Sequence, residues 1–590
     1  MGTVNKASSA KPPRAQDPQS ADTTPAMRAH TLAPQPPASA STDAQSTPRR
    51  DSVLEVLERE LSRSMQGFRI PGSPRPYYMH YALRRTHSLR LRAMYGSLTR
   101  ARETTHSSMF CDLRVGSHKF DNILDAGLDQ RAEDRESTDW TDAPDDLNLA
   151  ALQVALWKLS QIKYDEALAD YYDHKKAMVS EYLRDEVTAF TKEKPLDYRE
   201  PLSSRPFPRL VWETNLRELS RRFLDHPKVH DPIVAINAER VHRWLATTEG
   251  TRVVTEEVYL EVMLSGWVLT EDGVYTEASR ELYLRGLDEM PDRAALEAML
   301  DTLLAELSVL REAETPGAFI GPALLSGQAA STLFHEALGH RLEGDRLVAR
   351  DETRTFAHKV GKRILPEAIS VYDDPTLETF DGRSVWGSYR VDDQGVRAQR
   401  ASLVEDGVLR GFLHGRTPTP HNTASNGHGR HDGLELPMSR MANLVVEARG
   451  DGALSREALE EKLLETARAQ GRKEAMIIER IQGGETSTQA YDFQVFKGEP
   501  AEVYRIDVET GEKTRVRDVE LIGTPLAALQ RIIAVGVDLQ TDQGYCYAES
   551  GSIPVSGIAP ALLLSELEMQ QSSTTGFHEP LLPPPFADDG

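Results

Sequence analysis

The chain is organised around the stretch Ser331-Thr-Leu-Phe-His-Glu-Ala-Leu-Gly-His340. His335, Glu336 and His340 spell H-E-x-x-x-H, and two imidazoles beside a carboxylate are the side chains that metal-dependent hydrolases use. In a regular helix residues i and i+4 lie nearly one above the other, whereas i+5 falls well round the helix. The spacing therefore predicts a helix that ends or distorts at Leu338-Gly339, with His340 turning back towards His335. A glycine at this position makes the distortion inexpensive.

The apolar residues of this stretch predict that one face of the helix is buried. Ala330, Leu333, Phe334, Ala337 and Leu338 occupy positions i, i+3, i+4, i+7 and i+8. The two motif residues that flank the stripe, 335 and 336, are expected at the edge of the core, where a cavity can form. With 17 histidines and at most 91 acidic residues, the motif is expected by chance about 0.08 times per chain. The motif alone leaves open that its histidines are polar helix residues with ordinary hydrogen bonds.

A catalytic zinc site uses three protein ligands and keeps one position open, so a third ligand is needed. The downstream candidates are His358, His414, His421, His428, His431 and Cys546. Three of these histidines lie in the Gly/Asn/His-rich loop 421–431, whose composition suits a ligand source. A thiolate from Cys546 would bind zinc strongly and bring negative charge to the metal. The residues by themselves leave all six candidates open.

Composition excludes several classes of protein. The 590 residues are enough for two to four domains, and Lys+Arg 69 against Asp+Glu 91 gives a net charge of −22. This charge argues against nucleic acid or an anionic membrane as the main partner. Cys111 and Cys546 are the only cysteines, so no disulfide framework is indicated. No apolar run reaches 18 residues and no signal-peptide core is present, so we predict a cytoplasmic protein.

The first half is predicted to be an N-terminal α/β domain, residues 51–313, with antiparallel strands and long helices. Residues 1–50 are rich in Pro, Ser and Ala and are expected to be disordered. Helices are predicted to start near Asp51 and over 292–313, and a helical insert over 147–192 is expected to end before Pro195. Strands are predicted between Pro76 and Asp121, with Cys111 buried, and a meander follows, with turns at 249–250 and 272–273.

The second half is predicted to be a β-rich, barrel-like catalytic domain, residues 314–570, with residues 571–590 as a flexible tail. Its helices are expected to be the motif helix, packed across an antiparallel sheet, and 456–470. Strands are predicted at 385–391, 401–413, 443–447, 475–480, 503–508, 519–522 and 553–557. The predicted fold class of the whole chain is therefore α+β.

Residues 318–568 resemble the TldD/PmbA family of metallopeptidases, specifically its metal-bearing, TldD-like branch. The order and spacing of several motifs carry this resemblance: His335–His340, Leu342–Asp345, Asp392–Gly395, Glu405–Gly411, Ser425–Gly427, Pro437–Asn443, Gly483-Gly484, Leu521–Gly523, Val535–Asp538, Gly544–Cys546 and Ile553–Val555. The first half matches more weakly, through Asp112–Gly116, Asp121-Asn122 and Trp244–Thr251. Arg341 stands where the family usually has glycine, so the backbone after the second motif histidine is expected to be less free.

The resemblance implies a zinc ion (Zn²⁺) held by His335, His340 and Cys546, with Glu336 as the general base. It also implies unfolded or flexible peptides as substrates, and a homodimer or a heterodimer with a metal-free family member. The histidine-rich loop is then expected near the site. The candidates for substrate contact are Asn426, Gly427, His428, Arg440, Gly483 and Gly484. An extended peptide is expected to bind by strand addition.

Three other functions remain compatible with the sequence. The chain could be a non-catalytic partner subunit, although the three implied ligands and the glutamate are all present. The metal site could be purely structural, although structural zinc usually has four protein ligands. The enzyme could also carry out a modification step in the maturation of a peptide natural product.

Overall fold

The computed structural model describes residues 51–128, 139–180, 187–449, 452–490, 495–572 and 584–586. The segment predicted to be disordered, 1–50, lies outside these ranges, as does most of the predicted tail. Residues from Asp51 onwards form one compact unit. Within the tail, the ring of Phe586 lies 5.1 Å from that of Tyr95. None of the described helices combines the length and the apolar content needed to cross a membrane.

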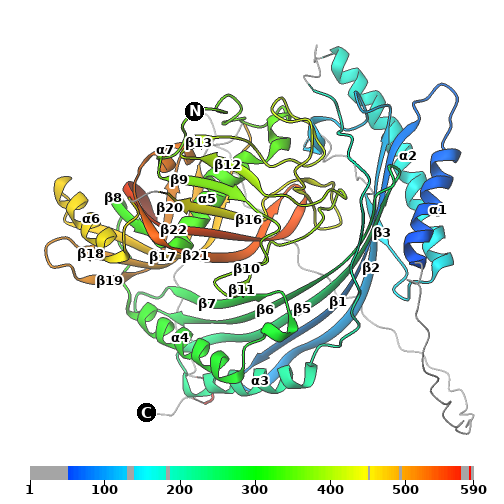
Figure 1. Ribbon diagram of the computed structural model, residues 1–590. Coiled ribbons are helices and arrows are strands. Elements are labelled where there is room, and N and C mark those ends of the chain that lie inside the picture. Colours follow the sequence, from blue (N-terminus) through cyan, green and yellow to red (C-terminus); the bar gives the residue numbers. More distant parts are fainter. Residues whose placement is uncertain are drawn as a thin grey trace, which may run out of the picture. The chain divides into compact units, whose positions relative to one another are not determined.

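The first half is built on a curved sheet with the strand order β3-β2-β1-β5-β6-β4, in which β7 also pairs with β6 (Figure 1). Its strands are β1 (Pro76–Met94), β2 (Ser97–Val115), β3 (Trp140–Asp142), β4 (Asp197–Arg199), β5 (Val229–Thr247), β6 (Arg252–Leu269) and β7 (Tyr275–Leu284). All pairs are antiparallel except β4–β6. The predicted turns join β5 to β6 at Gly250 and β6 to β7 at Gly273, both with positive φ.

Four helices cover the outer face of this sheet (Figure 1). They are α1 (Ser52–Gly67), α2 (Leu149–Ser180), α3 (Arg209–Arg221) and α4 (Arg293–Glu312). The carboxylate of Asp51 caps α1 by accepting hydrogen bonds from the first turn. Cys111 is buried with α1 and α2, as predicted. Helix α3 packs on β1, β2 and β5, and α4 packs on β6 and β7. Short 3-10 turns occur at Asp125–Gly127, Arg222–Asp225 and Leu287–Glu289.

The predicted helical insert extends too far towards its C-terminal end. The structure describes α2 as far as Ser180, and residues 187–192 form bends instead of helix. The N–H groups of Ala189 and Thr191 donate to the carbonyls of His118 and Arg416, at 2.9 and 3.0 Å. Because these donors are used in tertiary contacts, they cannot continue a helical ladder.

The second half contains an 11-stranded sheet with the order β13-β12-β9-β16-β22-β20-β18-β17-β8, with β19 beside β18 and β21 beside β22. Its strands are β8 (Phe319–Leu325), β9 (Ile369–Asp373), β12 (Ala401–Glu405), β13 (Val408–Leu409), β16 (Asn443–Ala448), β17 (Glu474–Thr486), β18 (Phe496–Asp507), β19 (Lys513–Val516), β20 (Val519–Gly523), β21 (Ile532–Ala548) and β22 (Gly551–Gln571). Two small hairpins accompany it: β10 (Thr379–Phe380) with β11 (Arg383–Ser384), and β14 (Gly429–Arg430) with β15 (Met438–Ser439).

The expected antiparallel sheet is corrected to a mixed one, and its barrel-like form stays a prediction. The pairs β16–β22 and β17–β8 are parallel. A further pairing of β22 with β8 joins β22, β20, β18, β17 and β8 into a ring. The remaining strands extend from β22, except β19, which pairs with β18. The fold is therefore α+β, with two sheets and long helices.

The predicted strand 385–391 is absent. The N–H groups of Trp386 and Gly387 donate to the hydroxyl of Ser556, so a side chain and not a neighbouring strand satisfies them. A helix that the sequence did not predict, α7 (Pro525–Gln530), starts with proline in its first turn.

The motif helix lies against one face of the sheet. Helix α5 (Gly327–Phe334) packs on β22, β17 and β21, and α6 (Arg456–Ala469) packs on another face of the same region. Strand β8 serves both, because Ala323 and Leu325 face the α5 side whereas Leu324 faces α6. Ser326 begins α5 by accepting a hydrogen bond from Ala329 N.

Candidate metal centre

The motif lies where α5 changes its helical geometry. After Phe334 the chain forms one π-helical turn, His335–Gly339, and then a 3-10 turn, His340–Leu342. The N–H of His340 donates to the carbonyl of His335, five residues earlier. A π turn places residues i and i+5 on the same side, so the wide motif spacing becomes compatible with a shared ligand. The predicted distortion is present and begins at His335, before the predicted position.

Gly339 is needed for space and not for backbone freedom. Its φ and ψ of −54° and −57° are ordinary right-handed values. A Cβ atom at this position would lie 2.0 Å from Sδ of Met441. The reason expected from sequence, an inexpensive distortion at a glycine, is therefore replaced by close packing of the turn on Met441.

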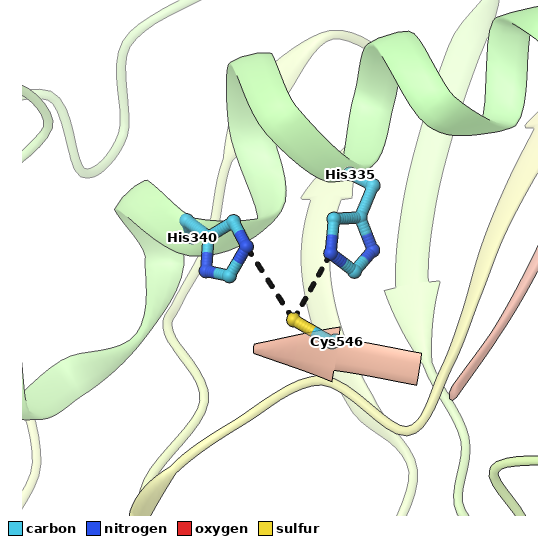
Figure 2. A group of neighbouring side chains, drawn as sticks. All are labelled: His335, His340 and Cys546. Atoms are coloured by element: carbon cyan, nitrogen blue, oxygen red, sulfur yellow. Dashed lines mark hydrogen bonds between the residues drawn. The ribbon is translucent and has the colours of Figure 1, made fainter. Parts of the chain in front are cut away.

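The three predicted metal ligands meet in space (Figure 2). Figure 2 shows both imidazoles reaching down from the helix towards Cys546 on β21. Sγ of Cys546 lies 3.2 Å from Nε2 of His335 and 3.5 Å from Nε2 of His340. Tetrahedral zinc bonds of ordinary length separate nitrogen from sulfur by about 3.6 Å. Within the part of the chain that is described, this is the one His/Cys/Asp/Glu group whose donor atoms all lie within 4.8 Å of one another.

The electrostatics of the group favour the ligand form of the thiol. Burial by itself would raise the pKa of Cys546, but His340, Arg440 and His335 outweigh burial and hold that pKa well below its usual range. Burial would lower the pKa of His340, whereas the Cys546 thiolate and Glu343 raise it well above its usual value. A thiolate held between two imidazoles is the donor set that binds zinc and other soft divalent ions.

Buried charged side chains lie behind the predicted metal ligands and hold them in place. Glu343 Oε1 lies 3.2 Å from Nδ1 of His340, the ring nitrogen that faces away from the thiol. Arg346 contacts Glu343 at 2.8 Å. Arg440 lies 3.5 Å from Glu343 and donates at 2.8 Å to the backbone carbonyl of Cys546. A carboxylate behind a ligating imidazole fixes the ring's orientation and raises its basicity.

Glu336 is positioned by two neighbours. Gly484 on β17 leaves room for it, since a Cβ there would lie 2.6 Å from Cγ and 2.8 Å from Oε1 of Glu336. Arg341 donates to the Glu336 carbonyl at 2.8 Å, and also to Thr486 Oγ1 and the Ser487 carbonyl, both at 2.9 Å. The arginine that replaces the family glycine therefore ties the π turn to the end of β17. The sequence showed this departure from the family pattern, but it did not predict the hydrogen bonds of Arg341.

The group opens into a cleft of about 1080 Å³. His335, Glu336, His340 and Cys546 all line it, with segments of β7, β17 and β21 around them. Asp542 lies in the same cleft, where burial raises its pKa to about 6 although Gln328 and Thr332 donate hydrogen bonds to it. The predicted metal ligands, Glu336 and Asp542 therefore line one cleft.

Two of the six predicted substrate contacts line the cleft, namely Gly483 and Gly484. His428 is fully buried between Asn426 and Asp373, and Gly427 packs on the backbone of Arg397. Arg440 is also fully buried.

These positions make Asn426, Gly427, His428 and Arg440 supports of the surrounding structure and not cleft surface. The other histidines that were open as ligands also lie outside the donor group. His421, for example, contacts the carbonyl of Ala357.

Two histidines, one cysteine and an adjacent glutamate are side chains that metal-dependent hydrolases use. The family model described as the PmbA/TldA metallopeptidase C-terminal domain matches residues 320–571. A metalloprotease of Methanocaldococcus jannaschii is 30% identical over 311 residues, which cover 52% of this chain and 63% of that protein. A metalloprotease TldD homolog of Haemophilus influenzae is 30% identical over 251 residues, which cover 42% and 47%.

Among solved structures, TldE of Thermococcus kodakarensis has a TM-score of 0.58 at 16% identity, covering 87% of this chain and 99% of that one. This likeness concerns the fold alone. Residues 320–571 of the chain match the C-terminal domain of the TldD/PmbA family. The chain's matches span 46–63% of the length of three archaeal relatives described as metalloproteases. The names of these relatives indicate a metallopeptidase at the level of the family.

Proposed function

We propose that the chain is a zinc-dependent metallopeptidase that cleaves unfolded or flexible peptides. The observation that carries this proposal is the convergence of His335, His340 and Cys546 beside Glu336 in one cleft. Three protein ligands leave a fourth position for water or a carbonyl oxygen, as in catalytic zinc sites. A relative in Saccharolobus solfataricus, 23% identical over 348 residues, which cover 58% of this chain and 72% of that one, is described as a zinc metalloprotease TldD homolog.

Zinc bound there would lower the pKa of a water molecule and polarise the scissile carbonyl. The chain's own residues supply the remaining steps. Glu336 accepts the proton of the attacking water and delivers it to the leaving amine. Glu343 keeps the His340 ring in its ligating orientation. The thiolate of Cys546 makes the metal a weaker Lewis acid than a third neutral histidine would.

Free strand edges support an extended peptide as the substrate. In the described structure Thr541–Ala548 of β21 pairs with β22 on one side only, and Ile481–Thr486 of β17 pairs only with β18. Both edges line the cleft. A peptide that pairs with such an edge must be extended, and its backbone then lies beside the metal site. This arrangement suits unfolded substrates, because a folded segment cannot add a strand to the edge.

The test is metal content and peptidase activity of Glu336→Gln. This variant keeps the three ligands, so we expect wild-type zinc content and a loss of about 10²–10⁴ in turnover. Cleavage at the wild-type rate by the zinc-loaded variant would show that Glu336 is not the base. A wild-type chain that binds zinc but cleaves no peptide in a library digest would refute the peptidase.

The partner and the compartment are also proposals. We propose a dimer, either of two copies or with a metal-free family member, which size-exclusion chromatography with and without the candidate partner would test. We propose the cytoplasm because both cysteines are free thiols.

A further inference from the structure

An aromatic cavity adjoins the metal cleft on the other side of β21. It has a volume of about 290 Å³ and an aromatic lining of Tyr259, Trp386, Tyr545 and Tyr547. Its charged lining residues are Glu239, Glu261 and Arg90. Tyr545 and Tyr547 also line the metal cleft, so the two spaces meet at this strand. Neither the metal site nor its supporting charges use these residues.

The aromatic walls are partly buried and partly open. The ring of Trp386 lies 5.0 Å from Tyr259 and 5.9 Å from Tyr545, both edge-on. Trp386 is 1% exposed, and its Nε1–H has no partner among the described residues. Tyr545 and Tyr547 are 43% and 76% exposed. The indole N–H of Trp386 is a donor and cannot bind a cation, so the exposed rings of Tyr545 and Tyr547 are the aromatic surfaces that the cavity offers to a cationic occupant.

The charges of the cavity select the sign of that occupant. Glu239 is paired with Arg90 at 2.8 Å. Glu261 accepts a hydrogen bond from the uncharged amide of Asn237 at 2.9 Å. Burial and the carboxylates Glu281 and Glu239 raise the pKa of Glu261, although Asn237 and Arg90 lower it in part. Since Arg90 is already paired with Glu239, Glu261 is the carboxylate of the cavity that has no cation in direct contact among the described ion pairs. Carboxylates and aromatic faces together favour a cation, because both present negative charge to it.

Strand alternation brings a substrate side chain to this cavity. Cys546 points towards the motif helix, and its neighbours Tyr545 and Tyr547 point to the opposite side of β21. If a peptide pairs with the free edge of β21, the residue opposite Cys546 faces the metal. The residues immediately before and after it then face the aromatic cavity.

We propose that this cavity is a specificity subsite for a basic side chain, arginine or lysine, of a peptide bound along β21. This inference rests on the proposed function, because the ligand is taken to be a peptide substrate. Glu261 is the counter-ion, and Tyr545 and Tyr547 are the aromatic walls. Tyr259 contributes less, since the Arg285 guanidinium already lies 4.2 Å from its ring centroid.

The test measures binding, so that it does not depend on cleavage. The full-length, zinc-loaded Glu336→Gln variant is titrated with fluorescein-labelled alanine-based peptides that carry one arginine, norleucine or glutamate at each position in turn. At one or two positions we expect arginine to bind about tenfold tighter than norleucine, and glutamate to bind more weakly than both. Adding Glu261→Gln should bring the ratio of arginine to norleucine close to one. Adding Glu271→Gln, at an exposed carboxylate outside the cavity, should leave the ratio unchanged.

The outcomes separate this inference from the peptidase. Equal binding of arginine and norleucine peptides at every position would overturn the subsite, whether or not the wild-type protein cleaves them. A preference that survives Glu261→Gln would also overturn it. A preference that disappears with Glu261→Gln, in a protein that cleaves nothing, would support the subsite and refute only the peptidase.

Discussion

Replacing Gly484 with alanine should displace Glu336, the proposed general base, without disturbing the fold. A Cβ at Gly484 would lie 2.6 Å from Cγ and 2.8 Å from Oε1 of Glu336. Carbon atoms in ordinary contact are about 3.5–4.0 Å apart, so Glu336 must move by about 1 Å. The atoms that move belong to one side chain, from Cγ of Glu336 outwards, and it borders the open cleft. We therefore expect the free energy of unfolding to change by less than about 1 kcal/mol.

The loss should appear in turnover. A displacement of about 1 Å at a catalytic group can lower the rate about 10²-fold. We expect kcat of Gly484→Ala to fall by about that factor, with zinc content unchanged, in a continuous assay with a quenched fluorescent peptide. Mass spectrometry of the native protein would measure the zinc.

The neighbouring glycine provides a matched control. A Cβ at Gly483 would meet only Glu499 Oε2, at 3.5 Å, an ordinary contact. Gly483→Ala should therefore keep kcat within about twofold, and any effect on peptide pairing should appear in KM. Equal kcat values for the two variants, or a wild-type kcat for Gly484→Ala, would refute the placement of Glu336 as the base.

Three further outcomes follow from the same structure. Gly339→Ala should lower the free energy of unfolding by about 1–3 kcal/mol, since its Cβ would lie 2.0 Å from Met441 Sδ, and urea unfolding should show partial recovery when Met441→Ala is added. Glu343→Gln should weaken zinc binding by about 10–100-fold in a chelator competition, because it removes the carboxylate 3.2 Å from Nδ1 of His340; unchanged affinity would contradict its orienting role. Burial lowers the pKa of His80 to about 3, so below about pH 6.5 the unfolded chain binds a proton that the folded chain does not, and stability falls as pH falls. His80→Gln should flatten that fall by about 1.4 kcal/mol per pH unit between pH 6 and 4, measured by urea unfolding; a slope equal to that of the wild type would be the contrary result.

Local patterns were sufficient for the helices and for the motif. The Asp51 cap, the 292–313 periodicity and the apolar stripe around the motif each depend on residues within a few turns, and helix formation uses those same short distances. The spacing of His335 and His340 also predicted a distorted turn. The role of Gly339 was not predictable, because it depends on packing against Met441, about a hundred residues away in sequence.

The identity of the third ligand came from family resemblance, since the residues alone left six candidates open. In the fold, Cys546 meets His340 across 206 positions of sequence, and the register Cys546↔Ile553 between β21 and β22 sets the face that it presents. A slip of one residue would turn a tyrosine towards the histidines and Cys546 towards the aromatic cavity.

From the amino-acid sequence we could therefore identify the reactive side chains: two histidines, a glutamate, a small set of possible thiol and imidazole partners, and the elements that carry them. Which of these side chains share a cavity became clear from the fold. In the fold, the histidine-rich loop lies outside the cleft, and Arg440 is buried beside Glu343 and Cys546. The fold also brought Trp386, at a position expected to be strand, beside Tyr545. The physical reason is that strand register and loop packing are set by long-range contacts, which local periodicity does not record.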